Sequence, residues 1–510
     1  IREFDVNNFL LGYGTIAVFF GLVVLILERS NRRERTFTEY AVAGRSFGAW
    51  FQTMSFLNTW LPGTTFIAFA GLTAQSGLIG FYSIFYSLLA MLFMFFMAER
   101  MHEWGRKFDL RTQADFVGIR YNSSAVRVIA AVIGIISMLP WLVLGMQSVG
   151  AVFESLSFGH VSTTAAVFIG VAVLAIRQVW TVRMGMRGIV ISDMVQGITA
   201  YGLGFLISVG MIGWLLTHGH GFDKLPKEFA TLPGQGSTAG PLYFMSIVLT
   251  GALGAWCWPD IFVRLFTADG TTTIKKSALQ SAPLLAAFSA ALFVMSMLAH
   301  SLPAVAASPD KVWFTVTALG GPLLLAFAGV LVLAATMGNI NAITAAVGTQ
   351  IAQDIIPDRA LSDASRTKLA KVSIIVVTLL GVAGAIGTMH TTSGLVTWAI
   401  TSYQGVVQLA PSLYLGIFWR RGNATGAVVG MIVGFAMAAG LQIAYPLSVP
   451  WLGGLTSGVV GILVNTALYV LLALMAPADD REQARVNNLF RRSGIEPSAA
   501  VSNDPREPAM

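Results

Sequence analysis

Long runs of apolar residues alternate with short polar segments along most of the 510-residue chain. About 20 mainly apolar residues in a helix cross a bilayer core, and the pattern predicts thirteen such helices. Their approximate ranges are 8–28, 46–75, 78–98, 125–152, 161–179, 188–216, 241–266, 277–302, 316–350, 370–389, 394–418, 424–444 and 452–476. We therefore expect an all-α membrane protein with a polytopic domain over residues 1–476. Residues 477–510 are polar and predict a cytoplasmic tail with one short surface helix.

The second predicted helix carries the sequence NTWLPGTTF, residues 58–66, near its centre. Pro62 has no amide donor and disfavours helical geometry at the preceding residue, while Gly63 permits an unusual turn. In hydrocarbon, backbone groups freed in this way need protein or water as partners. The segment is therefore either a simple proline kink or a break that lines a cavity.

The seventh predicted helix is interrupted in a similar way. It contains TGALGAWCWPD, residues 250–260, with glycines at 251 and 254 and a proline at 259. Interrupted helices that open two five-helix units of opposite orientation are typical of inverted-repeat transporters with a midplane binding site. The expected repeats cover about residues 46–216 and 241–418, with one helix before them and two after.

Composition and charge agree with a membrane protein. The chain is 55% hydrophobic and 11% charged, with a mean hydropathy of +0.70, whereas soluble domains carry about 25% charged residues. If the N-terminus lies outside and the C-terminus in the cytoplasm, 28 of the 32 Lys and Arg residues fall in inner segments, as the positive-inside rule requires. We expect a multi-pass protein of the inner (plasma) membrane. The net charge of +7 then reflects topology and does not indicate a nucleic-acid partner.

Catalytic chemistry is not predicted. No nucleophile with a base and no cofactor motif lies at membrane depth, so we expect neither an enzyme nor a cofactor. The single cysteine, Cys257, excludes an internal disulfide. His218 and His220 in an outer loop are only a weak metal signal. Asp260 and Arg264, four residues apart on one predicted helix, are expected to pair with each other.

Six segments in chain order are characteristic of one transporter family: AVAGRSFGAW, FIAFAG, MRGIVISDMVQG, PDIFVRLFTADG, NAITAAVGTQIAQDI and APSLYLGIFWRRGNATGA. Through them the chain, over about residues 10–476, resembles the sodium/solute symporters, which include proline, pantothenate, sugar, sialic acid and monocarboxylate symporters. The resemblance implies a leucine-transporter-type core, alternating access and cation-coupled symport of a small organic solute. The solute is expected to be an amino acid or a monocarboxylate, and Na⁺ or H⁺ the coupling ion.

The resemblance also implies a sodium site between the break in the first core helix and the eighth core helix. Its carbonyl positions fall on Asn58 and Leu61. The family's paired Ser/Thr positions hold Gly338 and Asn339, of which only Asn339 has a side-chain oxygen. This departure favours an alternative, namely a sodium-independent transporter that is proton-coupled or facilitative. A solute-sensing membrane domain is a third and less favoured interpretation.

Asp193, in the sixth predicted helix, matches an aspartate that lies near a second ion position in the family. An intramembrane carboxylate is a functional candidate by default, and Asn341, close to Asn339 on the same helix, is placed to reach it. Buried without a metal, Asp193 is suited to carry a proton. The structural alternative is that it caps its helix or pairs with Arg183 or Arg187.

The resemblance places the substrate cavity among the first, sixth and tenth core helices. Those positions hold Trp60, Thr64, Thr65, Trp256, Trp258, Trp398, Ser402, Tyr403, Gln404 and Gln408. Tryptophans with a few polar groups form an aromatic box, which suits a quaternary ammonium, whereas half-helix N-termini suit a carboxylate. Ordinary packing is the alternative reading of these tryptophans.

Overall fold

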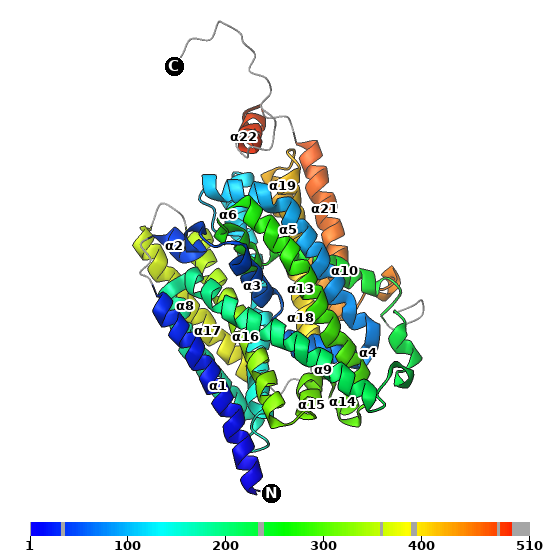
Figure 1. Ribbon diagram of the computed structural model, residues 1–510. Coiled ribbons are helices and arrows are strands. Elements are labelled where there is room, and N and C mark those ends of the chain that lie inside the picture. Colours follow the sequence, from blue (N-terminus) through cyan, green and yellow to red (C-terminus); the bar gives the residue numbers. More distant parts are fainter. Residues whose placement is uncertain are drawn as a thin grey trace.

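The computed structural model describes residues 2–31, 36–232, 239–356, 361–388, 395–476 and 480–491 (Figure 1). Every regular element in these residues is a helix, apart from two isolated bridges that join Phe47 to Ala268 and Val449 to Leu455. The predicted all-α class is therefore confirmed.

Long apolar helices make up most of the molecule. They are α1 (Arg2–Ser30), α5 (Tyr82–Lys107), α7 (Ser124–Ser155), α8 (Thr163–Gly197), α9 (Gly204–Thr217), α13 (Thr271–Leu298), α16 (Pro322–Gln350), α17 (Asp363–Thr388), α20 (Ala424–Ala444) and α21 (Ser457–Met475). In the described residues nine helical stretches are long and apolar enough to cross a membrane, or ten with one bent pair. Two of them, Thr65–Lys107 and Thr163–Thr217, contain 43 and 55 residues, at least about twice the length of one span. These stretches combine shorter helices, α4 (Ala70–Ser76) with α5 and α8 with α9, so the exact count of thirteen stays a prediction.

The first predicted break is present. Helix α3 (Ala49–Trp60) stops at Leu61, and the chain resumes as a π-helical turn (Thr65–Phe69) and helix α4 (Ala70–Ser76). A Cβ atom added at Gly63 would lie 1.8 Å from the Thr336 hydroxyl oxygen of α16. Glycine is required there because the interrupted backbone lies directly against α16.

The second predicted break is present as well. Helix α10 (Tyr243–Gly254) tightens into a 3₁₀ turn (Ala255–Cys257), and Trp258 is extended, with φ −72° and ψ 124°. Pro259 then opens α11 (Pro259–Phe262), where its missing amide is harmless, and α12 (Arg264–Thr267) follows. The helices on either side of the break are bent by 56°.

Helix α16 is the central element. It contacts α1, α3, α7, α8, α11 and α17. In its most apolar 18-residue segment, 83% of the residues are buried. Figure 1 shows α3 inside the bundle, with α1 along one side and α21 along the other. Both broken helices therefore lie against the most buried of the long apolar stretches in the described residues.

The polar tail forms a short amphipathic helix, α22 (Asp480–Arg491), which buries Val486, Leu489 and Phe490. Arg485 fixes it by donating hydrogen bonds of 3.0 and 2.8 Å to the carbonyl oxygens of Ile119 and Arg120. In Figure 1, α22 and the N-terminal end of α1 lie at opposite ends of the molecule.

Candidate functional site

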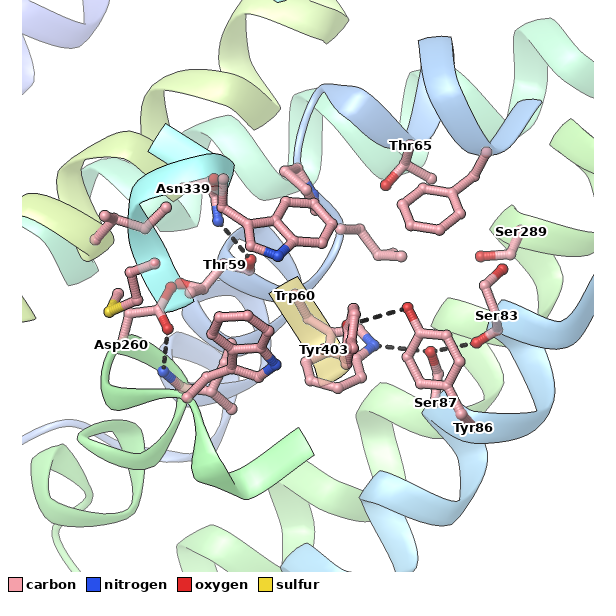
Figure 2. Close-up of a pocket in the computed structure, with 18 residues that line it drawn as sticks. Thr59, Trp60, Thr65, Ser83, Tyr86, Ser87, Asp260, Ser289, Asn339 and Tyr403 are labelled. Carbon is pink, nitrogen blue, oxygen red and sulfur yellow. Dashed lines mark hydrogen bonds between the residues drawn. The ribbon is translucent and has the colours of Figure 1, made fainter. Parts of the chain in front are cut away.

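A cavity lies between the two helix breaks (Figure 2). About 590 Å³ of space between its walls is free of protein atoms, open solvent included. Its lining residues are Thr59, Trp60, Leu61, Pro62, Thr65, Phe69, Ser83, Tyr86, Ser87, Met138, Trp141, Trp258, Asp260, Ile261, Ser289, Asn339, Ile343 and Tyr403. Both interrupted segments therefore face the same hollow, as expected for backbone groups that need partners away from lipid.

Protein donors satisfy two of the carbonyls that the first break exposes. The Tyr201 hydroxyl donates to the carbonyl oxygen of Leu61 at 2.8 Å. The Asn339 side-chain amide donates to the carbonyl oxygen of Thr59 at 3.1 Å. The broken helix is thus tied to its neighbours by hydrogen bonds that replace those lost within the helix.

A buried ionic cluster lies beside the same break. The Asp193 carboxylate, which is fully buried, accepts hydrogen bonds from the Ser55 hydroxyl at 2.7 Å and the Asn58 amide at 3.0 Å. The Arg264 guanidinium lies 3.5 Å from the same carboxylate and donates to the hydroxyls of Ser55 at 2.6 Å and Thr59 at 2.7 Å. A buried carboxylate needs such a cation and donors. Asp193 is therefore a paired charge that links α8 to both broken helices.

Gly338 explains how the Asn58 amide reaches Asp193. A Cβ atom at Gly338 would lie 1.8 Å from the Asn58 amide nitrogen and 3.0 Å from an oxygen of Asp193. A Ser or Thr side chain therefore does not fit at this position while Asn58 keeps its place.

Two sequence-based pairings are wrong. Arg264 does not pair with Asp260: its guanidinium is turned toward Asp193 and the hydroxyls of Ser55 and Thr59, although the backbone at Val263 between α11 and α12 stays helical, with φ −57° and ψ −24°. Asp193 does not pair with Arg183, which instead contacts Glu28 at 2.8 Å, and it lies in mid-helix, away from any cap.

Leu61, Asn341 and Asp193, three of the predicted sodium ligands, face protein groups, whereas the Asn339 side-chain oxygen has no hydrogen-bond partner in the described residues. The Leu61 carbonyl oxygen accepts a hydrogen bond from the Tyr201 hydroxyl, and the Asn341 side-chain oxygen accepts one from the Thr181 hydroxyl at 3.1 Å. Asp193 has a guanidinium as its neighbour. The described residues contain no group of three or more His, Cys, Asp or Glu side chains arranged to hold a metal ion. The residues around the first break thus fit a bound cation poorly in this conformation, and the ligand roles stay predictions.

Four of the residues predicted to bind substrate line the cavity: Trp60, Thr65, Trp258 and Tyr403. The remainder, apart from Trp398, are buried elsewhere: Thr64, Trp256, Ser402, Gln404 and Gln408. The Trp256 indole donates to the Ala90 carbonyl, and Gln404 and Gln408 hydrogen-bond the backbone of Gly458 in α21. The side chain of Trp398 lies outside the described residues.

Several lining residues escaped the sequence reasoning. Ser83, Tyr86 and Ser87 come from α5, Trp141 from α7 and Ser289 from α13. Hydroxyl-bearing residues at spacings of three and four in an apolar helix, as in α5, are the signal that was available. Asp260 was noted, but as the partner of Arg264 and not as a cavity residue.

Two broken helices that meet at a buried cavity within a bundle of apolar helices define a secondary transporter with a central binding site. The chain belongs to the Sodium:solute symporter family, whose pattern matches residues 40–434. It is thus a membrane transporter and not an enzyme.

Several named proteins align with nearly the whole chain. The uncharacterized symporter YhjB of Bacillus subtilis is 23% identical over 482 residues, which are 90% of this chain and 96% of that protein. A monocarboxylate transport permease protein of Rhizobium johnstonii is 24% identical over 508 residues, which are 93% and 98% of the two chains. A monocarboxylic acid transporter of Corynebacterium glutamicum is 22% identical over 470 residues, covering 85% of this chain and 83% of the relative.

Solved structures show the same fold. A substrate-bound, outward-open Na⁺-coupled sialic acid symporter matches with a TM-score of 0.73 and 18% identity, over 92% of this chain and 98% of that one. The nucleobase-cation-symport-1 family transporter Mhp1 matches with a TM-score of 0.54 and 14% identity, over 88% and 98% of the chains.

Proposed function

We propose that this chain takes up a small organic solute by cation-coupled symport, with the solute bound in the cavity between the two helix breaks. The observation that carries this proposal is that Leu61 and Pro62 of one break and Trp258 and Asp260 of the other line the same cavity. Discontinuous helices at the bilayer midplane are where transporters of this architecture hold their cargo.

An amino acid or a monocarboxylate is the proposed cargo class. The names of the relatives from Rhizobium johnstonii and Corynebacterium glutamicum support a monocarboxylate. The polar groups among the aromatic lining residues are suited to bind a small solute that carries a charged group.

Alternating access between two inverted repeats, at about residues 46–216 and 241–418, is the proposed mechanism. The two breaks belong to different repeats, so rocking of one repeat against the other opens the cavity first to one side and then to the other. We place the protein in the inner (plasma) membrane as a multi-pass protein, with its N-terminus outside and its C-terminus in the cytoplasm, because the Lys and Arg distribution favours that orientation.

Uptake into proteoliposomes tests the proposal. The purified protein is reconstituted and offered labelled amino acids, short monocarboxylates and betaines, with a sodium gradient and a pH gradient imposed separately. Accumulation of one solute class under one gradient is expected. Reconstituted, correctly folded protein that accumulates none of these solutes under either gradient would refute the proposal.

A second candidate is transport without sodium, coupled to protons or driven by the solute gradient. Two observations favour it. The Asp193 carboxylate already has the Arg264 guanidinium as its cation and a hydrogen bond from the Asn58 amide. The Leu61 carbonyl oxygen already accepts a hydrogen bond from the Tyr201 hydroxyl. In this arrangement the Arg264 guanidinium supplies the positive charge beside Asp193 that a bound sodium ion would otherwise supply. Equal uptake with sodium and with choline as the external cation would support this candidate and remove sodium coupling.

A further inference from the structure

We propose that Asp260 selects the ammonium group of a zwitterionic solute, so that the cavity takes an amino-acid-like molecule in preference to a simple monocarboxylate. This inference rests on the proposed function and narrows its cargo class. It follows from a polar asymmetry in the cavity, which has acceptors at one end and hydroxyl donors at the other.

Asp260 supplies a carboxylate that makes no direct ion pair within the described residues. The residue is 4% exposed and lines the cavity at the start of α11. One carboxylate oxygen accepts the backbone amide of Ile261 at 3.0 Å. Among the described residues no cationic group lies within ion-pair distance of Asp260, because Arg264 is turned toward Asp193. Arg264 acts on Asp260 only at longer range, because its guanidinium is committed to Asp193 and the Thr59 hydroxyl. A buried carboxylate is stabilised by a cation at contact distance, and a bound ammonium group would be such a cation.

Asn339 adds a second acceptor on the same side of the cavity. Its amide nitrogen is committed to the Thr59 carbonyl at 3.1 Å, which fixes the orientation of the side chain. Its side-chain oxygen is buried and has no hydrogen-bond partner in the described part of the chain. Figure 2 shows Asp260, Thr59 and Asn339 together at one end of the cavity. An ammonium group, which is a donor only, matches such an end.

Aromatic rings enclose the space next to Asp260. The ring of Tyr403 meets those of Trp258 at 5.2 Å, Trp141 at 6.1 Å and Tyr86 at 5.7 Å between centroids, each at a steep angle. Such walls present ring faces and edges in fixed positions, and ring faces attract cations. A small inorganic cation gains less here than an organic ammonium does, because the apolar walls replace its water poorly.

The opposite end offers hydroxyl donors. The Tyr86 hydroxyl accepts from Tyr403 at 3.3 Å, and its own proton has no acceptor in the described residues. Thr65 and Ser289 also line the cavity, and neither side chain makes a hydrogen bond to the part of the chain that the structure describes. Figure 2 places Thr65, Ser289 and Tyr86 across the cavity from Asp260. These three hydroxyls suit a solute carboxylate, which accepts hydrogen bonds only.

Matched pairs of solutes test the inference in the intact protein. Proteoliposomes are offered L-alanine against propionate, and L-proline against cyclopentanecarboxylate, because the members of each pair differ mainly in the amino group. We expect uptake of at least one zwitterion and little uptake of its deaminated partner. Uptake of the carboxylates with exclusion of the zwitterions would overturn the inference and leave the proposed function standing. Absence of uptake for the whole panel would refute the proposed function itself.

The variant Asp260→Asn keeps the shape of the side chain and removes its charge. Loss of a buried charge partner predicts a fall in apparent affinity for the zwitterion of about thirtyfold or more. Asp260→Glu should restore part of that affinity, and Asp223→Asn in the exposed outer loop is the matched control. An affinity within twofold of wild type for Asp260→Asn would overturn the inference. Loss of only a pH-driven component, with the preference for zwitterions intact, would also overturn it and make Asp260 a proton carrier. If Asp260→Asn fails to fold, the wild-type pairs above still decide the question.

Discussion

Replacing Gly338 with alanine should push the Asn58 side chain away from Asp193. The added Cβ would lie 1.8 Å from the Asn58 amide nitrogen, far inside contact distance, and 3.0 Å from the Asp193 carboxylate. Asp193 does not move freely, because Ser55 and Arg264 hold it at the same time. Asn58 must therefore rotate or α16 must shift.

The cost can be estimated from the two consequences. Overpacking of a well-filled interior costs about 1–3 kcal/mol. Loss of a hydrogen bond to a charged group costs about 1.5–3 kcal/mol. Together these give about 2.5–6 kcal/mol of destabilisation for Gly338→Ala.

Thermal unfolding of the purified protein in detergent, followed by tryptophan fluorescence, measures the effect. Gly210→Ala in α9 is the matched control, because a Cβ atom there meets nothing within 4 Å and alanine is the better helix former by about 1 kcal/mol. We expect a clearly lower unfolding midpoint for Gly338→Ala and no loss for the control. Equal midpoints for the two variants would refute the packing argument.

Three further predictions concern stability and ion dependence. Arg264→Met should destabilise the protein by about 3–5 kcal/mol because it strips Asp193 of its cation, and adding Asp193→Asn should recover part of the unfolding midpoint; no recovery would contradict the pairing. Tyr201→Phe removes the hydrogen-bond donor to the Leu61 carbonyl and should cost about 1 kcal/mol. Because that carbonyl is then free to bind sodium, added sodium should raise the unfolding midpoint more than in the wild type. An unchanged sodium response would argue against a sodium site that Tyr201 blocks. Burial raises the pKa of Asp115 above 3.8, so the folded state keeps this proton to higher pH than the unfolded chain and loses stability as pH rises above that value. Asp115→Asn should flatten the pH–stability curve just above pH 3.8, and an unaltered slope would contradict the assignment of this pH dependence to Asp115.

The breaks could be read from the sequence because their cause is local. Pro62 and Gly63, and likewise Pro259, act on the backbone within one or two residues. Their positions in the chain therefore predicted where the cavity would form.

The side-chain partners could not be read in the same way, because they depend on how helices rotate against one another. Arg264 was assigned to Asp260 from their four-residue spacing, but the packing of the helices brings its guanidinium to within 3.5 Å of Asp193 in α8 instead. Gln404 and Gln408 share an apolar segment with Tyr403, yet they face α21 while Tyr403 faces the cavity. Apolar residues cover nearly every face of these helices, so hydrophobic periodicity does not distinguish the cavity side from the packed side.

Site-directed labelling of the cavity tests the central claim most directly. A cysteine introduced by Ser289→Cys would be the single thiol in a Cys257→Ala background, and the native Cys257 is itself fully buried. We predict that a small maleimide reaching position 289 blocks solute uptake, and that the transported solute slows the labelling. Complete labelling with unchanged uptake, or labelling that the solute does not slow, would contradict a binding site between the two broken helices.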